Sequence, residues 1–214
     1  MKIDLHIHSR YSSDGSLTPE DIIKIARKKG LHGVAVTDHG TVRGGLEAKK
    51  YETDDFIVIA GVEIKTDRGE VIGLFLSKEI KSQRFQDVVI EIKAQGGLVV
   101  VPHPFDRMRR SAFRISEDEV NFVDAIEGFN GRSILQTYNR QAVAFAGKHN
   151  LPVVAGSDAH HANEIGLAGI ITDSRDIKDV IRRGDITIFG KTSPWLLLNH
   201  GRAQVRKVWR RATE

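Results

Sequence analysis

The chain has 214 residues, of which 40% are apolar and 28% charged, and this content suits one globular domain. It contains no cysteine, so any bound metal must be held by nitrogen and oxygen donors rather than by thiolates. No apolar run approaches the roughly 20 residues of a transmembrane helix, and the N-terminus lacks the apolar core of a signal peptide. We therefore expect a cytoplasmic protein without membrane contact.

The net charge of +4 is concentrated at the C-terminus. Five basic residues and one glutamate lie between Arg202 and Glu214, so this segment alone carries the net charge of the chain. A basic tail is suited to contact nucleic acid or another anionic partner, although a solvated chain end has the same composition. We divide the chain into a single barrel domain, residues 1–190, and a basic C-terminal segment, residues 191–214.

Short apolar strands alternate with amphipathic helices along the chain. We expect a first strand at 3–8, followed by a helix that begins at Thr18-Pro19 and ends at Gly30. The turn signal at 66–69 predicts a hairpin between strands at 57–64 and 71–76. Further strands are predicted at 33–37, 98–101, 125–129, 152–155, 170–171 and 187–189, and further helices at 46–51, 85–95, 116–120, 138–149 and 174–183. Repeated strand–helix units indicate an α/β fold with a mainly parallel sheet.

Polar residues capable of chemistry follow almost every predicted strand. A closed ring of parallel strands brings all its carboxyl ends to one face, whereas an open doubly wound sheet gathers only those beside its switch point. We therefore expect a barrel with one polar face, formed by His6, His8, Asp38, His39, Glu63, His103, Glu127, Asp158 and His160.

The first strand places His6 and His8 on one face, because strand side chains alternate. Two such imidazoles can bind one divalent ion, but His-x-His alone is a weak signal. The other fragments have ordinary alternatives: Asp14 in a turn, Asp38 as a helix cap and Asp158 in an Asx-turn. Because these alternatives would have to hold at every strand end at once, the pattern favours a metal centre.

Six motifs together resemble the PHP family (polymerase and histidinol phosphatase domains): DLHIHS at 4–9, SDG at 13–15, TDH at 37–39, GVE at 61–63, HP at 103–104 and GSDAH at 156–160. They occur in the family's order, and the resemblance covers nearly the whole chain up to about Gly190. It implies an α/β fold of the PHP type, a distorted (β/α)7 TIM-like barrel. It also implies a stand-alone member rather than a domain of a large polymerase.

The same resemblance implies two or three divalent metal ions, with Mn, Zn, Fe and Mg as the options. One ion would be held by His6, His8, Glu63 and Asp158, a second by Asp14, His39 and His160, and a third by His103 with Glu63 bridging to it. Many members place a further histidine in the strand after the glutamate, and Glu70 stands at that point here. A carboxylate ligand favours harder ions such as Mn²⁺ or Mg²⁺, unless Glu70 is a solvent-facing hairpin residue.

Such a metal cluster supports hydrolysis, because paired ions activate water, polarise a phosphoryl oxygen and stabilise the leaving oxygen. Catalytic roles are predicted for His39, His103 and Asp158. The sequence contains neither Gly-x-Ser-x-Gly nor a Gly-x-x-x-x-Gly-Lys phosphate loop. We predict a metal-dependent phosphoesterase acting on a phosphorylated small molecule or short oligonucleotide, such as a nucleotide, a 3′-phosphorylated nucleotide or histidinol phosphate.

The segment after His103 is rich in arginine, with four arginines in the eight residues 107–114. Guanidinium groups match phosphate geometry, which favours a phosphate clamp over a solvated basic loop. Phe105 or Phe113 could stack a base unless both belong to the core. The predicted substrate-binding residues are Arg107, Arg109 and Arg110, with Lys65 and Asn130 as weaker candidates.

The sequence leaves open three alternatives to this function. A nuclease that trims short RNA or DNA would use the same chemistry. A non-catalytic RNA-binding subunit of a ribonucleoprotein could be built on the same barrel, but such a subunit would be expected to have lost metal ligands. An amidohydrolase also uses a metal barrel, but its usual metal-facing lysine has no obvious counterpart in this sequence.

Overall fold

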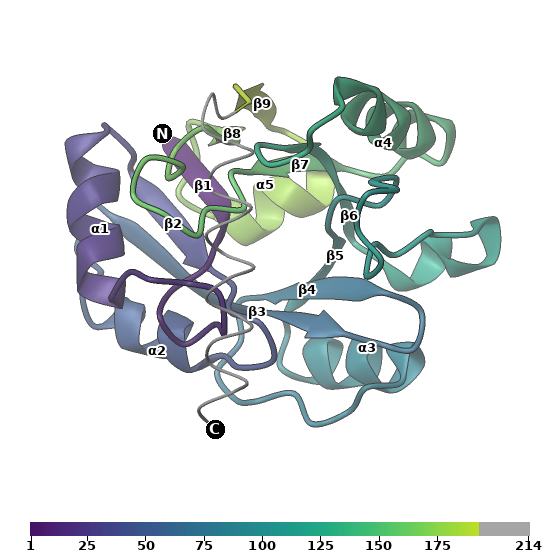
Figure 1. The fold of residues 1–214 in the computed structure, drawn as a ribbon, viewed down its shortest axis with the longest axis horizontal. Helices are drawn as coiled ribbons and strands as arrows, with labels where there is room; N and C mark the ends of the chain where they lie inside the picture. Colours follow the sequence, from purple (N-terminus) through teal and green to yellow (C-terminus); the bar gives the residue numbers. More distant parts are fainter. Residues whose placement is uncertain (193–214) are drawn as a thin grey trace.

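The computed structural model describes residues 1–192, so nearly all of the predicted basic C-terminal segment lies outside the described residues. The strands are β1 (Lys2–Ile7), β2 (Gly33–Val36), β3 (Ile57–Lys65), β4 (Glu70–Leu74), β5 (Leu98–Val101), β6 (Ala125–Asn130), β7 (Val153–Gly156), β8 (Ala168–Ile171) and β9 (Thr187–Gly190). The α-helices are α1 (Pro19–Lys28), α2 (Arg43–Lys49), α3 (Phe85–Ala94), α4 (Gln136–Lys148) and α5 (Ile177–Arg183). Figure 1 shows these elements along the chain.

The strands form one sheet in the order β7-β6-β5-β4-β3-β2-β1-β8-β9. Strands β1, β2 and β3 pair in parallel, as do β5, β6 and β7. Strand β4 is antiparallel to both β3 and β5, and the predicted hairpin between β3 and β4 is confirmed. Six of the first seven strands therefore point the same way. Their carboxyl ends meet at one end of the sheet, and so does the amino end of β4.

The sheet curls until its first strand approaches its seventh, which makes the fold a nearly closed, TIM-like barrel. The backbone amide of His8 donates to the carbonyl of Ala159, just beyond β7, at 2.8 Å. The amide of Ala159 donates in turn to the carbonyl of His6 at 3.3 Å. These two bonds continue β1 and β7 as a short parallel bridge. They join the two ends of the ring on the face where the polar residues lie.

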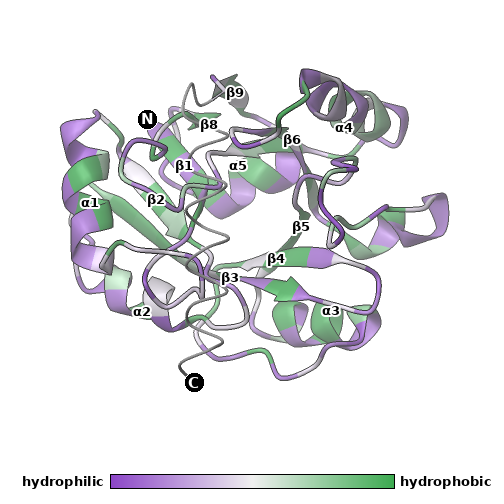
Figure 2. Cartoon of the chain, in the orientation of Figure 1, coloured by the Kyte–Doolittle hydropathy of each residue, from purple (hydrophilic) through white to green (hydrophobic). Residues whose placement is uncertain are grey.

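Local sequence explains where the first helix begins and ends. The Thr18 side chain accepts a hydrogen bond from the amide of Asp21, Pro19 occupies the first turn, and Gly30 follows with a φ of +74°. Along α1, Pro19, Ile22, Ile23 and Ala26 are buried, and Figure 2 shows the alternating hydrophobic and hydrophilic bands. The predicted helix at 174–183 begins only at Ile177, because the Asp176 side chain is its N-cap.

Within residues 1–192, three hydrophobic clusters make up the core. One joins side chains of β1–β8 to Ile177 and Ile181 of α5, which packs at the amino ends of the strands. The second lies between the sheet and helices α3 and α4, and the third between the sheet and helix α1. Figure 1 shows α1 and α2 on the side of β1–β3, and α3 and α4 beside the later strands. None of the helices within residues 1–192 has the length and hydrophobicity that a bilayer span requires.

Candidate metal centre

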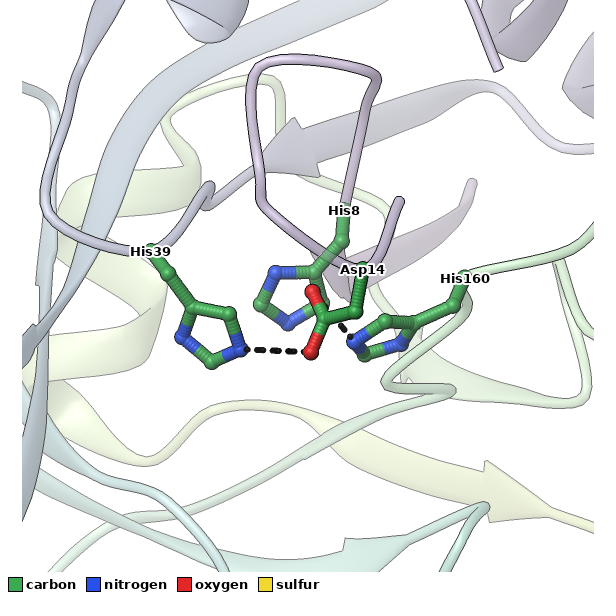
Figure 3. Close-up of side chains that lie close together, drawn as sticks. All are labelled: His8, Asp14, His39 and His160. Carbon is green, nitrogen blue, oxygen red and sulfur yellow. Dashed lines mark ion pairs between the residues drawn. The ribbon is translucent and has the colours of Figure 1, made fainter. Parts of the chain in front are cut away.

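The nine side chains predicted as metal ligands gather at the carboxyl end of the barrel. They come from the end of β1, the loop after it, the segments after β2, β5 and β7, and the facing ends of β3 and β4. Among these side chains only His39 is appreciably exposed, at 26%, and it lies at the accessible edge of the group. Figure 3 shows four of the nine, with Asp14 between His39 and His160 and the His8 ring beside them.

The innermost group consists of His6, His8, Glu63 and Asp158. The two histidine Nε2 atoms lie 3.0 Å apart, and each is 3.3–3.4 Å from Glu63 Oε2. Asp158 Oδ1 lies 3.4 Å from His8 Nε2 and 3.7 Å from His6 Nε2, and it forms no hydrogen bond. Four ligands around one ion at about 2.1 Å are about 3.4 Å from one another in a tetrahedron. These four donor atoms therefore fit a divalent ion.

The hydrogen bonds around His8 fix which of its nitrogens faces the cluster. Ser12 Oγ donates its single proton to the Asp38 carboxylate at 2.9 Å, so it can only accept from His8 Nδ1 at 3.1 Å. The Nδ1–H is thus occupied, and the Nε2 lone pair points into the centre. Ser12 Oγ also accepts from the amide of His39 at 2.9 Å, which ties both histidines to one buried carboxylate.

His6 is oriented by a carboxylate in the same way. Its Nδ1 lies 2.9 Å from Glu127 Oε1, which accepts a hydrogen bond from the ring N–H. The lone pair of Nε2 therefore points towards His8. The other oxygen of Glu127 accepts from the backbone amide of His103 and from the side-chain amide of Asn130, each at 2.9 Å. Two imidazole lone pairs held 3.0 Å apart repel unless a cation lies beside them. The arrangement therefore suits a metal ion or a proton.

Asp14 connects the outer histidines. Its Oδ1 lies 3.3 Å from His160 Nε2, and its Oδ2 lies 3.6 Å from His39 Nε2. The His8 ring is adjacent, with centroids 4.2 Å from His160 and 4.5 Å from His39. His8, Asp14, His39 and His160 thus offer donor atoms within 4.8 Å of one another, and His8 lies between the inner and the outer group.

Glu63 and Glu70 form the third part of the cluster with His103. Glu63 Oε1 lies 3.1 Å from His103 Nε2 while its Oε2 faces the inner histidines, so this carboxylate spans two positions. Glu70 is only 9% exposed, and its Oε2 lies 3.8 Å from His103 Nε2. It is therefore not a solvent-facing hairpin residue. Because β4 is antiparallel, its first residue reaches the same end of the barrel as the last residues of β3.

The charges of the cluster are strongly coupled. Burial opposes the ionised forms of Asp14, Glu63 and Asp158, but the neighbouring histidines, and Arg109 beside Asp158, lower all three pKa values. Burial likewise opposes the charged form of His8, yet the adjacent carboxylates of Asp158 and Glu63 raise its pKa to about 9. Without metal, the centre therefore combines ionised carboxylates with histidines that hold protons. Such a site exchanges protons for cations.

His160 differs from the other histidines because a buried arginine contacts it. Burial and the positive charge of Arg132 lower the pKa of His160 to about 3, so its ring is neutral. Arg132 Nη1 lies 2.5 Å from His160 Nδ1, and the guanidinium Nε lies 3.8 Å from Glu164. A neutral ring is the form that ligates a metal.

The predicted substrate-binding residues occupy different places. Arg109 turns inwards, where its Nη2 donates to Asp158 Oδ2 at 2.5 Å. Asn130 is fully buried, and its amide donates to Glu127 and Asp158. Arg107, Arg110 and Lys65 are exposed at the surface, Lys65 at the end of β3. The five residues therefore do not converge on one point, and their contact with substrate stays a prediction.

Several supporting residues had no assigned role in the sequence analysis. Arg132 and Ser12 fall in loops, where no pattern marks them. Glu127 and Asp38 were noted at strand ends, and the structure places them against His6 and Ser12. The sequence does not reveal the contact of Glu127 with His6 or that of Asp38 with Ser12, because each joins segments that are distant along the chain.

The backbone is strained at two of the predicted ligands. His103 and Asp158 have φ values of +32° and +54°, which are unusual for residues other than glycine.

Comparison with known proteins agrees with this geometry. The family model described as the PHP domain matches residues 4–183. The chain belongs to the PHP domain family. A two-domain protein from Bacteroides vulgatus that contains a predicted PHP-like metal-dependent phosphoesterase superposes with a TM-score of 0.71 and 20% identity, covering 93% of this PHP chain and 68% of that chain. This likeness supports the distorted TIM-like fold of PHP domains.

Two relatives in sequence extend the comparison. An uncharacterized protein of Methanocaldococcus jannaschii is 41% identical over 143 residues, which cover 61% of this PHP chain and 82% of that protein. A 5′-3′ exoribonuclease of Haemophilus influenzae is 39% identical over 82 residues, which cover 36% of this chain and 30% of that enzyme. The match to the exoribonuclease thus involves only part of either protein.

Proposed function

We propose that this PHP protein is a metal-dependent phosphoesterase that hydrolyses a phosphomonoester or a nucleotide phosphate. The observation that carries the proposal is the buried centre, in which imidazole nitrogens and carboxylate oxygens converge at ligand-like separations. Asp158 Oδ1 lies 3.4 Å from His8 Nε2 and 3.7 Å from His6 Nε2 and has no hydrogen bond, as expected for an oxygen placed to ligate a metal ion. All nine proposed ligand positions hold donor residues, which disfavours a non-catalytic subunit.

In the proposed reaction, water adds to phosphorus while the P–O bond to the alcohol breaks, and the departing oxygen takes up a proton. Two or three divalent ions, when bound by the nine proposed ligands, would supply an activated water and stabilise the developing negative charge. His39, the most accessible of the nine, is proposed to face the substrate, while Asp158 acts in the innermost group and His103 in the third part of the cluster. Arg109 and Arg132 would bring positive charge to the phosphoryl oxygens.

A nuclease that acts on short RNA or DNA is the second candidate. It is favoured by the partial match to the exoribonuclease, and it would require no change in the proposed centre. The substrate classes differ in whether the product is inorganic phosphate or a nucleotide, so one assay separates them.

The test is product analysis with full-length protein that has been chelated and reloaded with Mn²⁺. The substrates are a nucleoside monophosphate, a nucleoside 3′,5′-bisphosphate, histidinol phosphate and a short RNA. His39→Ala is the inactive variant, and His32→Ala, which changes an exposed histidine outside the centre, is its matched control. Release of phosphate or nucleotide by the wild type and by His32→Ala, but not by His39→Ala, supports the proposal. Tight RNA binding without any cleavage would refute it and favour a binding subunit.

A further inference from the structure

The segment after β5 lines a small cavity that contains none of the nine proposed metal ligands. It has a volume of about 350 Å³ and is lined by Phe105, Arg107 and Arg114. This volume is at the lower end of the range for small-molecule sites. Its accessible surface is mainly apolar, while both arginines are exposed to solvent.

The side chain of Phe105 lines this cavity and also packs against the ring of Phe145. It is only partly buried, and its ring lies 5.6 Å from that of Phe145 on α4, at an angle of 55°. Phe113, the other aromatic residue of the segment, is fully buried and packs 4.7 Å from Phe85. The structure thus separates the two candidates for stacking, because only Phe105 is available to a ligand.

The loop is held in a fixed position relative to the centre. Buried Asp106 accepts from the amide of Met108 at 3.0 Å and lies 3.3 Å from Arg109 Nε, while Arg109 reaches Asp158. This anchoring turns Arg109 inwards and leaves Arg107 outside. Phe105 follows His103 by two residues, so their Cα atoms are at most about 7 Å apart. The cavity is therefore lined by the segment that directly follows a proposed metal ligand.

Arg107 and Arg114 have no partner within the described part of the chain: neither forms an ion pair or a hydrogen bond there. Two free guanidinium groups beside an aromatic ring match a ligand that combines a flat ring with anionic groups. Nucleobases stack on aromatic side chains, and phosphates pair with arginine.

We propose that this cavity is a nucleotide subsite in which a base stacks on Phe105 while Arg107 and Arg114 contact a phosphate. The inference rests on the proposed function, because the bound nucleotide is a substrate only if the protein is a phosphoesterase. It narrows the substrate class from phosphomonoesters in general to nucleotides. A phosphomonoester without a base would miss the Phe105 contact.

Binding of non-hydrolysable ligands tests the subsite independently of catalysis. The probes are the 5′-methylenephosphonate analogues of AMP and of ribose 5-phosphate, which lack the scissile P–O bond, measured by calorimetry on the Mn²⁺-loaded full-length protein. Phe105→Leu should weaken the AMP analogue about tenfold and leave the ribose analogue unchanged, because one stacking contact is lost. Phe105→Trp should bind the AMP analogue about as tightly as the wild type does. This result would show that Phe105→Leu loses a stacking contact rather than its fold.

The arginines have a matched control elsewhere on the surface. Arg107→Ala and Arg114→Ala should each weaken the AMP analogue several-fold, whereas Arg175→Ala, which changes an exposed arginine that does not line the cavity, should not. Equal affinity of both analogues for the wild type, or an equal loss of both in Phe105→Leu, would overturn the proposal. Phe105-dependent binding of a nucleotide that is never hydrolysed would instead keep the subsite and refute the phosphoesterase.

Discussion

Loading of the inner position with metal should release protons. Before loading, hydrogen bonds and charges from the surrounding carboxylates hold the pKa of His6 well above its ordinary value and raise that of His8 to about 9, against the opposing effect of burial. At pH 7 the facing Nε2 atoms therefore share at least one proton. A metal ion requires both lone pairs, so binding must displace that proton.

The magnitude follows from the number of protons displaced. One proton per ion makes the apparent affinity rise tenfold from pH 7 to pH 8, equivalent to about 1.4 kcal/mol, and two protons make it rise a hundredfold. The metal-free protein should also lose stability as the pH rises from 6.5 to 9. A histidine whose folded pKa is raised stabilises the fold only while it remains protonated. For His8 alone this loss is at most about 3 kcal/mol.

Calorimetry in buffers of different ionisation enthalpy measures the protons directly, and thermal melts with and without metal follow the stability. His8→Ala should release fewer protons than the wild type, while His32→Ala should match the wild type. If metal affinity is the same at pH 7 and pH 8, the rings are neutral before loading and the reasoning from the carboxylate contacts is wrong.

Three further predictions follow from single contacts. Glu127→Gln would turn an amide group towards donors that now bind a carboxylate, and metal affinity should fall 10- to 100-fold in equilibrium dialysis with elemental analysis. Glu70→His should shift competitive loading from Mn²⁺ towards Zn²⁺, while Ser111→Ala, which removes only a hydrogen bond to Glu70, should not; an unchanged metal ratio would exclude Glu70 as a ligand. Gly45→Ala would place a Cβ 2.8 Å from a backbone carbon of β3 and should cost about 1–3 kcal/mol in denaturant unfolding. Gly147→Ala, with open space around it, should instead be neutral or stabilise by up to about 1 kcal/mol.

The barrel could be predicted from the sequence because the residues capable of chemistry lie at the ends of the predicted strands. His6, His39 and Glu63 lie at or just after strands whose apolar residues are easy to recognise, and parallel strands align their carboxyl ends. The hairpin between β3 and β4 was also predictable, because the turn at 66–69 leaves little freedom. Thr66 Oγ1 bonds to the Gly69 carbonyl at 2.7 Å, and Gly69 adopts a φ of +134°.

Contacts across the barrel were not predictable from spacing. Arg109 was expected to face a phosphate, but its nearest acceptor is Asp158, which lies 49 residues away, just after β7, the second strand from β5 in the sheet. Arg132 reaches His160 from the loop after β6 for the same reason. Long flexible side chains can turn inwards or outwards from one loop position, and only the packed neighbours decide which direction is stable.

The reversed strand β4 brings a second glutamate, Glu70, to the end of the barrel where Glu63 lies. If β4 were parallel to β3, its amino end would lie at the opposite end of the barrel from Glu63, and Glu70 could not reach His103. In the observed antiparallel register, Lys65 pairs with Glu70 and Glu63 with Ile72, so both glutamates lie at the same rim. Glu63 then faces the inner histidines with one oxygen and His103 with the other. The inner group therefore has equal numbers of nitrogen and oxygen donors, whereas the position at Glu70 has two carboxylates to one imidazole. Because harder ions prefer oxygen, the two ends of the cluster should differ in metal preference, which is the difference that Glu70→His would abolish.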